Sequence, residues 1–126
     1  MQVSSYQDLN VWKEGMRLTL AVYKLTSSFP DHERFRLVSQ MRRCEVSIPS
    51  NIAEGHARLS TREFIRHVSI SLGSLAELET QLHLAKALNY GDSVSYAELS
   101  GKSSQLGRQL RSLVKSLRSR INKENT

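Results

Sequence analysis

The chain has 126 residues, of which 39% are hydrophobic and 24% are charged, which is ordinary for one globular domain with a buried core. No apolar run approaches the roughly 20 residues that cross a bilayer, and the first residues lack the basic and apolar parts of a signal peptide. A single cysteine, Cys44, excludes an internal disulfide. We therefore expect one cytoplasmic domain spanning residues 1–126.

The net charge of +6 lies entirely at the C-terminal end. Residues 1–100 carry 11 basic and 11 acidic side chains, whereas residues 101–126 carry seven basic side chains and one acidic side chain. A basic segment of this kind attracts polyanions.

The first predicted helix covers about residues 8–27 and has two apolar stripes at helical spacing. Pro30 follows it, and the residue before a proline avoids the helical conformation. One stripe comprises Leu9, Trp12, Met16 and Tyr23, and the neighbouring stripe comprises Leu18, Val22, Leu25 and Phe29.

The second predicted helix covers about residues 32–54, and Gly55 follows where a C-terminal cap is expected. Pro49 lies inside it. A proline removes a backbone donor and clashes with the carbonyl four residues earlier, here that of Glu45, so the sequence predicts a kink. The inner face comprises Leu37, Met41, Cys44, Ile48 and Ile52.

Two capping boxes predict the starts of the last two helices. Ser60 with Glu63 begins a helix that runs to about residue 88, and Ser95 with Glu98 begins the last one. We expect residues 122–126 to fray. The core stripe of the third helix is Val68, Leu72, Leu75, Leu78, Leu82 and Ala85, and that of the fourth is Leu99, Ser103, Leu106, Leu110, Leu113, Leu117 and Ile121.

Four amphipathic helices with short connections must pack as antiparallel neighbours. The sequence therefore predicts an all-α protein, an antiparallel up-down-up-down four-helix bundle with a second helix kinked at Pro49.

Three segments, at residues 40–43, 47–55 and 73–80, together resemble the bacterial four-helix-bundle proteins encoded in intervening sequences of large-subunit ribosomal RNA genes. That family is similar to the accessory variability protein of diversity-generating retroelements. The chain departs from the family pattern at His56-Ala57, where an aromatic residue and a glycine are usual, and at Cys44-Glu45, where small residues are usual.

The resemblance implies a ring-shaped homopentamer and does not imply an enzyme. We expect no cofactor. The retroelement relative binds nucleic acid and partners a reverse transcriptase. By resemblance, this chain would have a reverse transcriptase or an RNA-processing protein as its partner. The fourth helix carries no family motif, so its role rests on the residues alone.

A polar cluster surrounds the proline motif, because positions 43, 47, 51 and 54 share one helix face. It is either a ligand pocket or acid/base site between helices or, as we favour, a hydrogen-bond network that fixes helix register and subunit packing. The motif residues are Arg43, Ser47, Pro49, Asn51, Glu54, Gly55, Glu77 and Glu79.

Catalytic and metal sites have little support. The four histidines are scattered, and Glu79 with His83 has the wrong spacing for a di-iron bundle. Cys44 falls on a core stripe, where a free cysteine acts as a small hydrophobe. Only Glu77, Glu79 and His83 could be nominated for an enzyme, so we expect neither an enzyme nor a bound metal.

Basic side chains form the strongest functional signal. They form one stripe opposite the apolar face of the fourth helix and a smaller one on the third, without interleaved aromatics. We expect phosphate contacts with nucleic acid, most naturally structured RNA. The alternative is a solvated face on a structural or protein-interaction oligomer. The residues are Arg108, Arg111, Lys115 and Arg118, with Arg58, Arg62 and Arg66.

Overall fold

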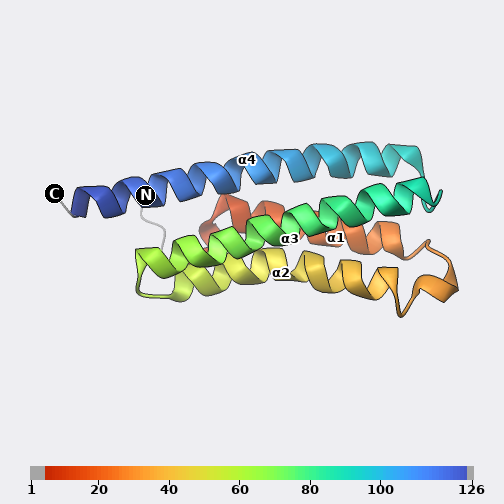
Figure 1. Cartoon of the computed structure of the whole chain (residues 1–126), viewed down its shortest axis with the longest axis horizontal. Helices are drawn as coiled ribbons and strands as arrows, with labels where there is room; N and C mark the ends of the chain where they lie inside the picture. The colour runs from red at the N-terminus through yellow and green to blue at the C-terminus, as the bar shows by residue number, and fades with distance from the viewer. Residues whose placement is uncertain (1–4, 125–126) are drawn as a thin grey trace.

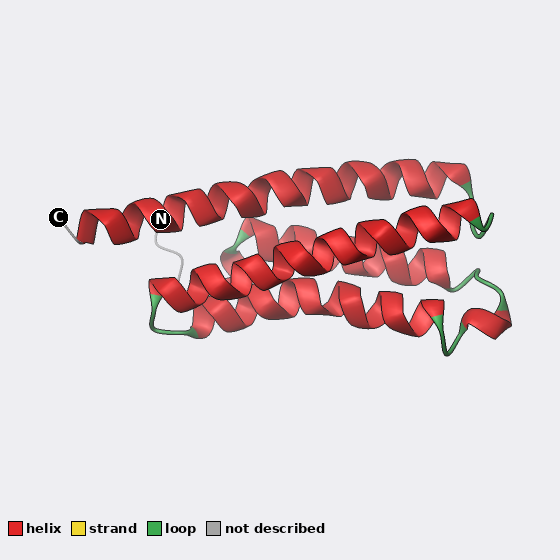
Figure 2. Ribbon diagram, viewed as in Figure 1, coloured by secondary structure: helices red, strands yellow, loops and turns green. Residues whose placement is uncertain are grey.

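The structure is a computed structural model that describes residues 5–124, and Figures 1 and 2 show an all-helical bundle. No strand occurs within this range. The all-α prediction is therefore confirmed. The elements are the short 3-10 helices η1 (Tyr6–Asp8) and η2 (Asp31–Glu33) and the long helices α1 (Asn10–Thr26), α2 (Leu37–Ala57), α3 (Thr61–Ala87) and α4 (Ser93–Glu124).

The four long helices form a ring of antiparallel neighbours, as predicted. Helix α1 packs against α2 and α4, and α3 packs against the same two helices. Helix α4 is the longest, and its C-terminal end extends past the other helices in Figure 1. This extension carries part of the basic segment.

Most residues of the predicted apolar stripes form one core, and the exceptions lie on α1 and at Ile121 of α4. The stripe of Leu18, Val22 and Leu25 is buried, whereas Trp12 is half-buried and Tyr23 is 40% exposed. The stripe that contains Trp12 and Tyr23 therefore lies beside the core and leaves apolar surface at the exterior.

The two predicted capping boxes have different outcomes. The Ser60 hydroxyl accepts a hydrogen bond from the Glu63 backbone N–H at 3.3 Å, so the start of α3 is confirmed. The second box is wrong, because α4 begins at Ser93. Asp92 accepts hydrogen bonds there from the N–H and hydroxyl of Ser95, both at 2.8 Å. A carboxylate just before the first turn caps the helix better than the later serine.

Gly55 is not a C-terminal cap, since α2 continues to Ala57. It is buried inside the helix, and a Cβ there would lie 2.6 Å from the Cβ of His67 and 3.3 Å from the backbone oxygen of Phe64. Gly55 therefore lets α2 and α3 approach closely. At the other end of the chain, α4 stays helical through Glu124, which differs from the frayed tail expected from residue 122 onward; residues 125–126 lie outside the described range.

Pro49 lies within α2, and the helix continues on both sides of it. The Glu45 carbonyl cannot receive the usual bond because Pro49 has no N–H. The hydroxyl of Thr19 on α1 lies 3.2 Å from this carbonyl and 2.8 Å from that of Gly15. Gly15 lies directly beside Pro49, since a Cβ there would be 3.5 Å from the proline Cβ. Helix α1 therefore satisfies the polar group that the proline leaves open.

The side chain of Glu45 is also buried, with 0% exposure. Neither of its carboxylate oxygens has a hydrogen-bond partner among the described residues. Burial raises the pKa of Glu45 to about 8, opposed by the charge of Arg42. The carboxyl is therefore mostly protonated at neutral pH.

We predict that Thr19→Val destabilises the protein by about 1–3 kcal/mol, because a buried carbonyl loses its partner. In a Pro49→Ala background the cost falls, since alanine restores the N–H that Glu45 lacks. Urea unfolding of the four proteins measures this coupling. Thr80→Val is the control, because the Thr80 hydroxyl bonds to Ala76 within its own helix. Equal costs of Thr19→Val in both backgrounds would contradict the account.

We predict that stability falls as the pH rises from about 5 to about 8. The folded state holds the Glu45 proton more tightly than the unfolded chain, whose glutamate pKa is about 4.3. This contribution is therefore complete below the unfolded pKa and is lost as the pH passes the folded one. Urea unfolding across this range should show the fall in wild type and in Glu54→Gln, an exposed control on α2, but a smaller fall in Glu45→Gln. The same fall in Glu45→Gln as in wild type would rule out this residue.

Candidate nucleic-acid interface

Two adjoining grooves lie between α3 and α4, where the N-terminal half of α3 faces the C-terminal half of α4. Their volumes are about 610 Å³ and 350 Å³, and they share Arg118 and Asn122, so we treat them as one basic groove. It is lined by Arg62, Ile65, Ser69 and Leu72 of α3 and by Arg111, Val114, Lys115, Arg118, Ser119, Ile121 and Asn122 of α4.

The structure brings four of the seven predicted basic residues to this groove. Arg111, Lys115 and Arg118 come from successive turns of α4, and Arg62 comes from α3. All four side chains are exposed. Helix geometry explains the grouping, because positions separated by three or four residues share a face.

The other three basic residues do not line the groove. Arg108 is exposed on α4, and Arg58 is exposed in the turn before α3. Arg66 donates a hydrogen bond to the Glu63 carboxylate at 2.7 Å, and this hydrogen bond holds the pKa of Glu63 below its usual value. The charge of Arg66 is therefore largely compensated.

No acidic side chain lines the basic groove within residues 5–124. Arg62, Arg111, Lys115 and Arg118 thus add their charges without local compensation. Such a concave positive surface concentrates anions. Phosphate groups fit it well, because guanidinium groups donate paired hydrogen bonds to phosphate oxygens.

Arg111 lies close over a glycine. A Cβ at the buried residue Gly107 would come 3.2 Å from a terminal nitrogen of Arg111 and 3.5 Å from Leu75. The missing side chain therefore provides the space in which this guanidinium group rests.

Sequence reasoning missed the parts of the groove that are not basic. Its floor contains the apolar residues Ile65, Leu72, Val114 and Ile121, and polar side chains lie among them. Finding these residues requires the register between α3 and α4, which no local pattern supplies.

A line of polar contacts joins α2 to α3. His67 donates from Nδ1 to the side-chain oxygen of Asn51 at 3.0 Å, and Arg66 lies 3.3 Å from the other ring nitrogen. Asn51 in turn donates to the Ser47 backbone oxygen at 2.9 Å, and the Ser47 and Ser74 hydroxyls lie 2.9 Å apart.

The predicted polar cluster is only partly assembled. Ser47 and Asn51 lie in the α2–α3 contacts, whereas Glu54 is exposed. Sequence reasoning missed His67 and Ser74, although with Ser71 they form a polar stripe at helical spacing on α3 that could have signalled the contact. The Ser71 hydroxyl donates to the Ile48 carbonyl at 2.8 Å. Pro49 and Gly55 are buried.

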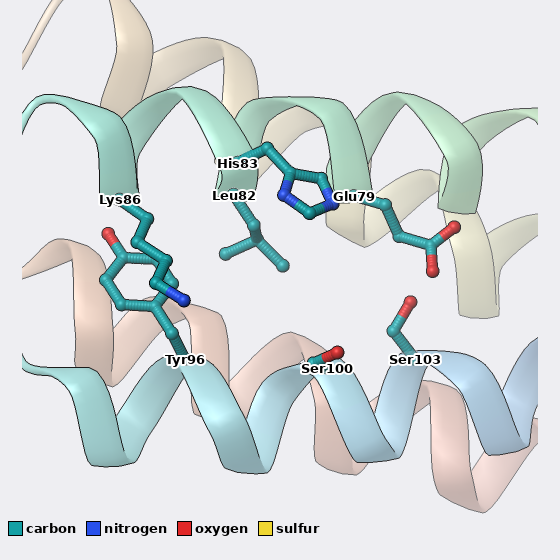
Figure 3. Close-up of a pocket in the computed structure, with 7 residues that line it drawn as sticks. All are labelled: Glu79, Leu82, His83, Lys86, Tyr96, Ser100 and Ser103. Atoms are coloured by element: carbon teal, nitrogen blue, oxygen red, sulfur yellow. The ribbon is translucent and has the colours of Figure 1, made fainter.

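The three residues that could be nominated for catalysis are divided between two hollows. Arg43 and Glu77 line a groove of about 460 Å³ between α2 and α3. Figure 3 shows Glu79 and His83 in a different pocket, of about 100 Å³, between α3 and α4. Glu77 therefore does not join Glu79 and His83 in one site.

Cys44 is buried, as predicted, and its thiol lies 2.9 Å from the Ser74 carbonyl. Burial, followed by a hydrogen bond with Glu77, raises the pKa of Cys44 to about 12. A nucleophilic cysteine requires the thiolate. This thiol is therefore inert at neutral pH.

Residues 5–124 offer neither a metal site nor a membrane span. No group of three or more histidine, cysteine, aspartate or glutamate side chains in this range could hold a metal ion. Likewise, none of the helices described combines the length and apolar character needed to cross a membrane.

Comparison with known proteins gives a family. The sequence model of the 23S rRNA-intervening sequence protein family matches residues 7–112. A crystal structure from Bacteroides thetaiotaomicron, described as a protein of unknown function from the S23 ribosomal protein family, has the same fold with a TM-score of 0.76. It is 24% identical, and the match covers 83% of this chain and 95% of that one. None of the curated proteins compared matches the chain. The family match spans most of the sequence, and the chain therefore belongs to the 23S rRNA-intervening sequence protein family.

Proposed function

We propose that this protein is a non-enzymatic, cytoplasmic, oligomeric scaffold that binds structured RNA through the basic groove. One observation carries the proposal. Four exposed basic side chains from two helices surround one groove that no described acidic side chain lines. They are Arg62, Arg111, Lys115 and Arg118.

The physical basis is contact with phosphates. Each neutralised phosphate releases counterions, so affinity depends on salt and only weakly on sequence. The family name, which refers to intervening sequences of 23S rRNA, supports RNA as the polyanion. The resemblance to the retroelement accessory protein also supports a nucleic-acid ligand, with a reverse transcriptase or an RNA-processing protein as a further partner.

The apolar stripe of α1 that contains Trp12 and Tyr23 supports oligomerisation. Leu20 is 64% exposed and Tyr23 is 40% exposed, beside the half-buried Trp12 and Met16. A homopentamer, as the family resemblance implies, would repeat the basic groove five times. The same stripe favours the alternative function, a structural or protein-interaction oligomer that binds no nucleic acid.

We predict salt-dependent RNA binding that the groove charges control. Fluorescence anisotropy with a folded RNA should give a log–log salt slope of about −3 per chain, from four basic contacts. Arg111→Glu, Lys115→Glu and Arg118→Glu combined should abolish binding, because three attractions become repulsions.

The control is Arg34→Glu, Lys86→Glu and Lys102→Glu combined, which changes the net charge equally at exposed positions outside the groove and off helix α1. Its affinity should fall far less. Both variants should keep the wild-type oligomeric state by light scattering. Equal losses in the two variants, or no binding by wild type at about 50 mM salt, would refute the proposed groove.

A further inference from the structure

The floor of the basic groove is apolar, which phosphate binding alone does not require. Ile65, Leu72 and Ile121 are half-buried and Val114 is only 7% exposed. These side chains lie between the basic residues of the two helices. A ligand that fills the groove must therefore present a flat or apolar part as well as negative charge.

Groups that can read a base also line the groove. The Asn122 side chain offers both a donor and an acceptor, and Ser69 and Ser119 offer hydroxyls. Arginine and lysine side chains only donate. An asparagine beside an apolar floor matches the edge of a nucleobase, which carries donors and acceptors together.

Arg111 adds a planar surface. Its guanidinium group rests over Gly107, where a Cβ would come within 3.2 Å of it. Unpaired bases stack on arginine planes as well as on aromatic rings. The absence of aromatic side chains from the groove lining therefore does not prevent stacking.

The shape of the groove selects against a duplex. It lies between two packed helices, whose axes are typically about 8–10 Å apart. An RNA duplex carries its phosphates outside and its bases inside, so it can reach the basic rims but not the floor. A nucleotide that is swung out of a helix can reach both.

We propose that the basic groove binds an unpaired nucleotide in a bulge or loop of folded RNA. The base lies against the apolar floor near Val114 and Ile121, and the flanking phosphates contact Arg111, Lys115 and Arg118. This inference rests on the proposed function and names the part of the RNA that is recognised. An acidic amphipathic peptide also combines charge with apolar groups, but it does not need the asparagine and serine side chains.

The test compares three RNAs, of which the second and third have the same arrangement of phosphates. One is a blunt duplex, the second carries a bulge of unpaired uridines, and the third carries the same bulge without bases. We expect wild type to bind the uridine bulge about tenfold tighter than either other RNA, because losing the stacking of one base weakens binding by about that factor. An acidic amphipathic peptide is tested in parallel.

Variants separate the contribution of the apolar floor to RNA affinity from that of the basic side chains. Ile65→Thr with Ile121→Thr should bring the three affinities together while leaving duplex binding unchanged, and Asn122→Ala, at an exposed position, should lower bulge affinity alone. Leu84→Thr, at an exposed apolar position of α3 outside the groove, is the control and should change nothing. Equal affinity for all three RNAs would overturn this inference and leave the proposed function intact. Binding of the peptide without binding of any RNA would overturn both.

Discussion

One backbone carbonyl imposes the main constraint on this bundle. Pro49 leaves the carbonyl of Glu45 without its helical partner in the centre of the fold, and a buried carbonyl without a partner is costly. The Thr19 hydroxyl shares its proton between this carbonyl and that of Gly15, and Gly15 lies against the proline. This pairing fixes the axial position of α1 along α2. Sliding α1 by a single turn would move Thr19 away and leave the carbonyl open.

The other face of α2 fixes the position of α3. The side chain of Asn51 accepts a hydrogen bond from His67, and the Ile48 carbonyl accepts one from the Ser71 hydroxyl. The absence of a Cβ at Gly55 lets α3 approach closely. These contacts set the height of α3, and the α3–α4 turn and shared core then set that of α4. The register places basic side chains of α3 opposite those of α4. The polar centre of the bundle thus determines where the basic groove forms, although none of its residues lines that groove.

The sequence predicted local features well, because each depends on neighbours along the chain. Apolar spacing placed the four helices, although α2 begins at Leu37 and not near residue 32, and Ser60 was correctly identified as a cap. Predictions that depend on neighbours in space were weaker. Gly55 was expected to end a helix but lies inside one, and α4 begins at Ser93, where Asp92 instead of Ser95 provides the cap. The exposure of the four groove cations followed from helix periodicity, whereas the apolar floor and the contacts of His67 and Thr19 required the packing of two helices to be known.

The proposed RNA-binding surface is the basic groove with its apolar floor, to which the last helix contributes most of the charge. Photocrosslinking tests this account most directly. Folded RNA containing 4-thiouridine would be irradiated with the protein, and the attached peptides mapped by mass spectrometry. The account predicts crosslinks within residues 62–72 and 111–122. Crosslinks confined to α1, or none above those given by an unrelated basic protein, would contradict it.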